Sequence, residues 1–149
     1  MKSESLKWGQ PLQGCRLSIS MSSLRMESGS PIQLTLVFRN DGPFVIKVPR
    51  FSLWFDYEFK IRYNELHQIS LTPFGQQQKD NSMMSATNVF ELAPGQEMTS
   101  AVEISRLYDL RLPGKYVMEA SRELPNPSGQ GFIKVVSNSL EFEVFQTRQ

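Results

Sequence analysis

The side chains that could carry out nucleophilic, acid–base or metal chemistry are few in this chain. It holds one cysteine, Cys15, and one histidine, His67. A cysteine or serine hydrolase needs its nucleophile beside a general base, yet these two residues belong to different predicted elements, and no Gly-x-Ser-x-Gly elbow occurs. They also fall short of the four nitrogen and sulfur ligands of a structural zinc site. We therefore expect no enzymatic activity, no metal and no cofactor.

A pair of carboxylates, Asp56 and Glu58, stands two residues apart in a predicted strand. Alternate side chains share one face of a strand, so this pair could in principle do general acid–base work. Lys60 and Arg62 continue the same face. The pattern favours a solvated face with alternating charges over an active site.

Trp54 is the exception on that polar face, because the other residues at even positions from 52 to 62 are polar. An exposed tryptophan beside charged residues such as Asp56 and Arg62 is typical of a protein-interface anchor. It could also stack on a sugar ring, with Tyr108 as a second aromatic. The alternative is that a loop, or the segment around Trp8, covers the indole.

Two predicted loops supply the other candidate binding residues, because loops on a rigid scaffold commonly carry recognition. Residues 73–82 are rich in glutamine and charge and include Gln77 and Lys79. Residues 124–131 hold two prolines and two glycines and include Asn126 and Ser128. The alternative for both loops is a plain solvated connection.

A strand over residues 51–63 must position these side chains. Every odd residue in this range is apolar or aromatic, and the even residues are polar apart from Trp54. A period of two predicts one buried and one solvated face, so we expect this strand to be the inner wall of the core. Thirteen residues exceed the usual strand length, which predicts a bulge or bend near the middle.

Turn signals divide the remaining chain into short alternating segments. Further strands are expected over residues 15–21, 32–38, 44–48, 68–72, 83–92, 98–104, 116–121, 132–136 and 140–144, with Val89 and Phe90 as the anchors of the weakest one and a single helical turn capped by Ser105. The pattern predicts an all-β, two-sheet antiparallel sandwich of about 7–9 strands. We expect one domain over residues 13–146, a lead-in over 1–12 and a tail over 147–149.

The run from Asp109 through Gly114 to Tyr116 resembles the tyrosine corner of immunoglobulin-like Greek-key domains. The resemblance implies that the Tyr116 ring packs in the core while its hydroxyl reaches backbone near Leu110. The run Leu34–Asn40 and the turn Leu92–Gly95 are also similar to small bacterial immunoglobulin-like modules, such as the intracellular proteinase inhibitor family. The cysteine pair of antibody domains is missing.

The composition narrows the classes of partner. A net charge of +1 offers no long-range field for nucleic acid or an anionic membrane. The first residues contain no apolar run, so no signal peptide is expected, and with a single cysteine this favours the cytoplasm unless a leader has been removed. We expect a non-catalytic protein-binding module of the adaptor, inhibitor or immunity type, monomeric or weakly dimeric. A carbohydrate-binding module is the alternative.

Overall fold

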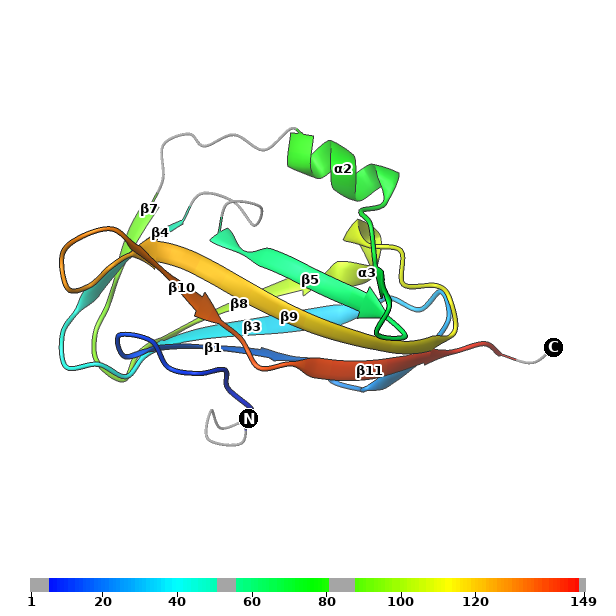
Figure 1. Ribbon diagram of the computed structural model, residues 1–149, viewed down its shortest axis with the longest axis horizontal. Helices are drawn as coiled ribbons and strands as arrows, with labels where there is room; N and C mark the ends of the chain where they lie inside the picture. Colours follow the sequence, from blue (N-terminus) through cyan, green and yellow to red (C-terminus); the bar gives the residue numbers. More distant parts are fainter. Residues whose placement is uncertain (1–5, 51–55, 81–87, 148–149) are drawn as a thin grey trace.

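Two layers of mainly antiparallel strands face each other in the computed structural model, which describes residues 6–50, 56–80 and 88–147 (Figure 1). One sheet has the order β1-β3-β8, and the other has the order β2-β11-β9-β5-β6, with β10 also paired to β9. A further two-stranded sheet joins β4 to β7. The strands are β1 (Cys15–Ser20), β2 (Arg25–Glu27), β3 (Gln33–Asn40), β4 (Ile46–Arg50), β5 (Glu58–Tyr63), β6 (His67–Gln68), β7 (Asn88–Leu92), β8 (Glu97–Glu103), β9 (Gly114–Pro125), β10 (Phe132–Val136) and β11 (Leu140–Phe145), and the helices are α2 (Pro73–Asp80) and α3 (Ile104–Leu107).

The hydrophobic core lies between the two main sheets and is built from alternating strand positions. Leu34, Leu36 and Phe38 of β3 face Met118 and Phe142 of the opposite sheet within one buried cluster. Burying such a side chain contributes about 1.5–3 kcal/mol before chain entropy is counted. The observed strands and their pairing confirm the expectation of a mostly β protein with antiparallel sheets.

Strand β5 confirms part of the expected inner wall. Phe59 and Ile61 are buried, and the intervening Glu58, Lys60 and Arg62 are exposed. The strand begins at Glu58, so the predicted thirteen-residue strand is not continuous to Asp56, and residues 51–55 lie outside the described residues. Asp56 is buried, which contradicts the predicted solvated position.

Helix α2 replaces the predicted loop over residues 73–80, and residues 81–82 of that loop lie outside the described residues. The Thr72 hydroxyl accepts the Gly75 amide at 2.9 Å and so caps the helix, and Pro73 suits the first helical turn because it needs no amide partner. The segment has few apolar residues, so its sequence carries no helical hydrophobic stripe. The helix instead packs through the buried Gly75 against Leu107.

Two finer predictions about anchoring residues are wrong. Val89 and Phe90 are exposed on β7, and Leu92 is its buried residue. The helical turn after β8 exists as α3, but Ser105 does not cap it, because its hydroxyl accepts the Ile32 amide at 2.9 Å. Neither helix in the described residues is long and apolar enough to cross a bilayer.

The N-terminal lead-in is held along β1. The Gly9 amide donates to the Leu17 carbonyl at 3.0 Å, and the Ser18 hydroxyl donates to the Lys7 carbonyl at 2.6 Å. The guanidinium of Arg16 lies 4.6 Å from the centre of the Trp8 ring. This part of the lead-in therefore covers the β1 edge of the three-stranded sheet.

Candidate functional site

The structure does not bring the predicted binding residues into one site. Arg62 is exposed on β5, while Gln77 and Lys79 are exposed on α2. Asn126 and Ser128 lie in the loop between β9 and β10 at the other end of the molecule (Figure 1). Trp54, the leading candidate, lies outside the described residues.

Asp56 belongs to a buried cluster around Arg122 of β9. The Arg122 guanidinium is 2% exposed, and its Nη2 lies 3.8 Å from the Asp56 carboxylate. The same nitrogen donates to the Pro49 carbonyl at 2.6 Å, and the guanidinium lies 4.9 Å from the centre of the Tyr57 ring. These contacts join β9 to β4 and to the residues just before β5, so Asp56 lies buried among them instead of on the predicted solvated face.

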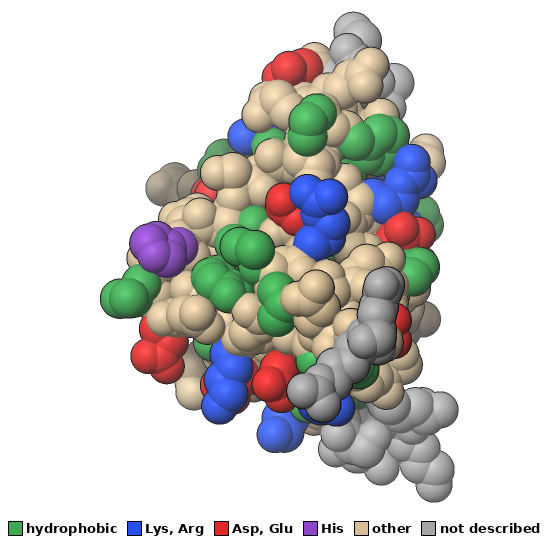
Figure 2. All heavy atoms as spheres, turned by 90° about the vertical axis from the view of Figure 1, so that its right-hand side faces the viewer, with side chains coloured by type: hydrophobic (Ala, Val, Ile, Leu, Met, Phe, Trp, Pro, Cys, Tyr) green, Lys and Arg blue, Asp and Glu red, His purple; other side chains and the backbone are tan. Residues whose placement is uncertain are grey.

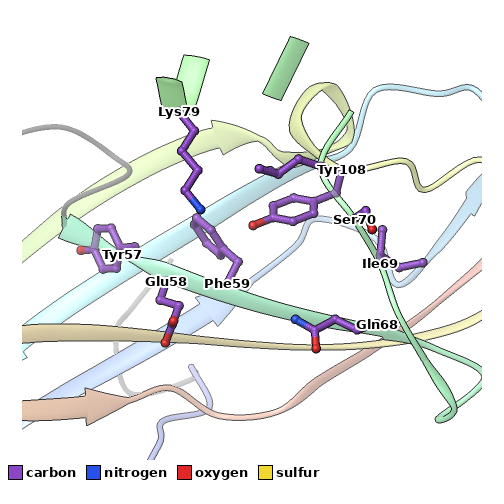
Figure 3. A pocket seen from close by; sticks show the side chains of 9 residues that line it. Tyr57, Glu58, Phe59, Gln68, Ile69, Ser70, Lys79 and Tyr108 are labelled. Atoms are coloured by element: carbon purple, nitrogen blue, oxygen red, sulfur yellow. The ribbon is translucent and has the colours of Figure 1, made fainter. Parts of the chain in front are cut away.

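A hollow of about 570 Å³ lies beside the outer edge of β5, and we call it the edge pocket. It lies between β5, the segment that follows β6, and helix α2 (Figure 3). Its lining residues are Tyr57, Glu58, Phe59, Gln68, Ile69, Ser70, Leu71, Lys79 and Tyr108. Ligand pockets in proteins fall between roughly 300 and 1,000 Å³, so the edge pocket is large enough for a small ligand or several side chains.

The floor of the edge pocket is aromatic but offers no flat stacking platform. Phe59 meets Tyr108 edge to face at 73°, with ring centres 6.4 Å apart, and meets Tyr57 at a tilt of 33° and 6.5 Å. All three rings are buried, so Tyr108 is not the exposed aromatic predicted from the sequence. Burial, and to a lesser extent the charge of Glu58, raises the pKa of the Tyr108 hydroxyl, which therefore stays protonated and can donate.

The two charged residues of the edge pocket, Glu58 and Lys79, differ in their ion pairing. Glu58 makes an ion pair with Lys134 at 3.0 Å, and this hydrogen bond holds the pKa of the Glu58 carboxyl below its usual range. Lys79 extends from α2 towards Phe59 and Tyr108 (Figure 3). No carboxylate within the described part of the chain pairs with it. Lys79 is thus a cation in the pocket lining without a carboxylate partner among the described residues, whereas the carboxylate of Glu58 is already paired.

A second surface lies at the end of the sheets where β3, β9 and β10 meet their loops. We call Phe44, Val45, Pro127, Ser128 and Phe132 the loop-tip surface. Phe44 is 75% exposed and Phe132 is 69% exposed. Phe44, Pro127 and Ser128 line a common hollow of about 380 Å³. Large apolar side chains in water are informative when they gather, because such patches mark interaction sites.

Buried and local hydrogen bonds hold the loops of this surface. The side-chain amide nitrogen of Asn40 donates to the backbone carbonyls of Phe44 and Leu92, at 2.8 Å each. The side-chain oxygen of Asn40 accepts the Gly42 backbone amide at 2.9 Å. Asn126 accepts both the amide and the hydroxyl of Ser128, at 3.0 and 2.8 Å. Asn126 therefore shapes its loop, and Ser128 reaches the surface.

The groups that could do catalysis are apart in the fold. Cys15 is buried on β1, and this burial, aided by the charge of Asp41, raises the pKa of its thiol to about 11. His67 is exposed at the end opposite the loop-tip surface, where acidic, basic and apolar side chains are interspersed (Figure 2). The described ranges contain no group of three or more His, Cys, Asp or Glu side chains that could hold a metal ion.

The sequence did not predict most residues of the edge pocket or of the loop-tip surface. Tyr57 and Phe59 were expected in the core, and they are buried there, but nothing in their spacing shows that a pocket opens beside them. Phe44 follows a turn with the sequence Asn-Asp-Gly-Pro, and Phe132 follows a glycine-rich loop. A large aromatic residue directly after a turn is a signal that could have marked the loop-tip surface.

The chain matches no protein-family model and no curated protein sequence. Similar solved structures include a β-glucosidase from Listeria innocua, in complexes with glucose and with gluconolactone, each at 13% identity and a TM-score of 0.41. The match covers 87% of this chain but 16% of the enzyme chain. A similarity of this strength assigns neither an activity nor a ligand.

Proposed function

We propose that this chain is a non-catalytic protein-binding module with an immunoglobulin-like sandwich fold, and that it binds its partner through the loop-tip surface. The observation that carries the proposal is the exposure of Phe44 and Phe132 at the same end of the sheets. Aromatic side chains are enriched among the residues that dominate binding energy at protein interfaces. Adaptor, inhibitor and immunity-type proteins all fit this class.

The immunoglobulin-like assignment draws support from the tyrosine that the resemblance singled out. The Tyr116 hydroxyl donates to the Leu112 carbonyl at 2.7 Å, four residues upstream and two residues from the expected Leu110, and its ring is fully buried. Gly114 has a φ of +145°, a conformation that other residues rarely adopt. Asp109 binds Arg111 at 2.9 Å at the exposed entrance to the corner.

The scaffold behind the loop-tip surface suits recognition without a large change of shape. The two hydrogen bonds from Asn40 tie the Phe44 backbone to the buried end of β7 at Leu92. A loop backbone that is held in place loses less entropy when it binds, which improves affinity. We therefore expect the partner to meet a largely preformed surface.

The carbohydrate-binding alternative has less support. It requires two or three coplanar exposed aromatic rings, and Tyr108 is buried at 73° to Phe59. The remaining predicted platform residue, Trp54, lies outside the described residues. A glycan array probed with the purified chain separates the two classes, because a protein-binding module should give no hit there.

The test of the proposal uses the purified chain as bait in native extract, with identification of the captured protein and reconstitution from pure components. Phe44→Ser and Phe132→Ser should each weaken the reconstituted complex at least tenfold, which corresponds to about 1.4 kcal/mol. Leu66→Ser is the matched control, because Leu66 is 82% exposed but lies in the turn at the opposite end. Equal affinities for all four proteins would refute the loop-tip surface as the binding site.

A further inference from the structure

Strand β5 has an outer edge that its neighbours only partly cover. The strand pairs along its whole length with β9, but on its other side β6 pairs only with Arg62 and Tyr63. The next residue along, Ile69, donates to the Ile61 carbonyl at 2.8 Å. From Phe59 back to Glu58 the outer edge has no strand partner among the described residues.

The register shows which backbone groups face this open edge. The Asn64 amide donates to the Lys115 carbonyl at 2.8 Å, so the even residues of β5 direct their backbone groups towards β9. In an antiparallel pair the backbone N–H and C=O groups of the odd residues must then point away from β9, towards the outer edge. The carbonyls of Ile61 and Tyr63 do so and accept from Ile69 and Leu66. By the same alternation, the Phe59 amide and carbonyl face the open side.

The open edge and the edge pocket coincide. Phe59 lines the pocket, and the segment of Gln68–Leu71 and helix α2 form its opposite wall. An extended chain can add a strand to an exposed sheet edge, gaining main-chain hydrogen bonds, while pockets select its alternate side chains. The volume of about 570 Å³ leaves room for this.

The charge of the pocket selects the chemistry of such a chain. Lys79 reaches over the opening and lacks a carboxylate partner in the described residues, whereas Glu58 is already paired with Lys134. The Tyr108 hydroxyl points to the same space (Figure 3). An ammonium group and a phenol donor together suit a carboxylate, because charge-assisted hydrogen bonds are the stronger ones.

We propose that the edge pocket binds an extended peptide segment that pairs with Phe59 on the outer edge of β5 and places an acidic side chain beside Lys79. The inference rests on the proposed protein-binding function and names the ligand class of a second surface. The peptide would add a strand next to β5, and its acidic residue would lie between Lys79 and Tyr108.

The experiment selects phage-displayed random dodecapeptides on the full chain. The most enriched peptide is then synthesised with an amidated C-terminus, so that only side chains can supply a carboxylate. We expect one recurring Asp or Glu among residues that favour strands. Lys79→Glu should weaken binding of that peptide at least tenfold, whereas Lys79→Arg should retain it. Lys60→Glu is the matched control, because Lys60 is an exposed cation on the same strand that does not line the pocket, and it should change the affinity less than twofold.

Backbone pairing is tested separately by hydrogen exchange and by peptide methylation. Exchange of the Phe59 amide should slow when the peptide is bound, and in a scan of singly N-methylated peptides methylation of the amide that donates to the Phe59 carbonyl should abolish binding. Failure to enrich an acidic motif, equal weakening by Lys79→Glu and Lys60→Glu, or unchanged exchange at Phe59 would each overturn the proposal. Phe44→Ser should leave the peptide affinity unchanged, and loss of binding in that variant would place the peptide at the loop-tip surface instead.

Discussion

Tyr63 and Tyr116 are paired across β5 and β9, and their hydroxyls donate to two successive carbonyls, those of Pro113 and Leu112, at 2.5 and 2.7 Å. Their ring centres are 5.0 Å apart. Gly114 is the first residue of β9, and a Cβ atom at this position would come within 2.8 Å of the Tyr63 ring. The two tyrosines together hold the chain where it enters its longest strand.

The first prediction follows from the difference in burial between these tyrosines. Tyr116→Phe should lower the free energy of unfolding by about 1–2 kcal/mol, because it leaves the Leu112 carbonyl without its donor beside the core. Tyr63→Phe should cost less, because Tyr63 is only half-buried and water can replace its hydroxyl. Urea denaturation of both variants measures this, and a larger loss for Tyr63→Phe would contradict the assignment of Tyr116 as the principal anchor.

The second prediction concerns the buried guanidinium of Arg122. Arg122→Ala removes the donor to Pro49 and leaves the Asp56 carboxylate without this cation, so it should lower the free energy of unfolding by about 3–5 kcal/mol. Arg62→Ala is the control, because Arg62 is exposed on the neighbouring strand and should change stability by about 0.5 kcal/mol or less. A loss for Arg122→Ala as small as that for Arg62→Ala would show that the buried cluster adds nothing to stability.

The third prediction concerns the contact that positions α2 and hence Lys79. Alanine normally stabilises a helix interior relative to glycine by about 1 kcal/mol. At position 75 a Cβ atom would lie 2.3 Å from the Leu107 carbonyl oxygen, so Gly75→Ala should destabilise the protein instead. Thermal unfolding checks the sign, with Gln77→Ala as the control on the exposed side of the same helix. A raised melting temperature for Gly75→Ala would mean that α2 does not pack closely on Leu107.

Much of the β architecture can be predicted because strand alternation is a local property. Leu34, Leu36 and Phe38 alternate in the sequence and are all buried. Helix α2 has no such stripe, since its one buried residue is a glycine, and its start depends on Thr72 in the preceding segment. Tertiary packing there outweighs the composition of the segment.

The candidate surfaces were harder to predict, because each joins segments distant in sequence. Lys79 was identified from a polar stretch, yet its position over Phe59 and Tyr108 depends on the packing of α2 against α3. For Asp56 the predicted environment is wrong, because this residue is buried. Alternation placed it with the solvated residues, but Asp56 precedes the start of β5 and lies beside Arg122, a residue 66 positions later in the chain. No local pattern encodes that pairing.

The last prediction uses the thiol of Cys15, which burial keeps protonated. Its pKa rises from an ordinary 9.0 to about 11 in the folded chain. Between these values the unfolded chain binds fewer protons than the folded one, so stability must fall as the pH rises above 9. The contribution of this group between pH 8 and pH 10 is on the order of 1 kcal/mol.

Cys15→Val removes this contribution and keeps a small apolar side chain in the core. Urea unfolding at pH 8 and pH 10 should show a smaller loss of stability for the variant than for the parent protein. Tyrosines whose pKa values are raised, such as Tyr116 at about 12, add the same pH dependence to both proteins and cancel in the comparison. The parent thiol should also react with a thiol reagent only after denaturation. Rapid modification of the native protein at pH 8, or identical pH profiles for the two proteins, would show that the Cys15 thiol is accessible to water.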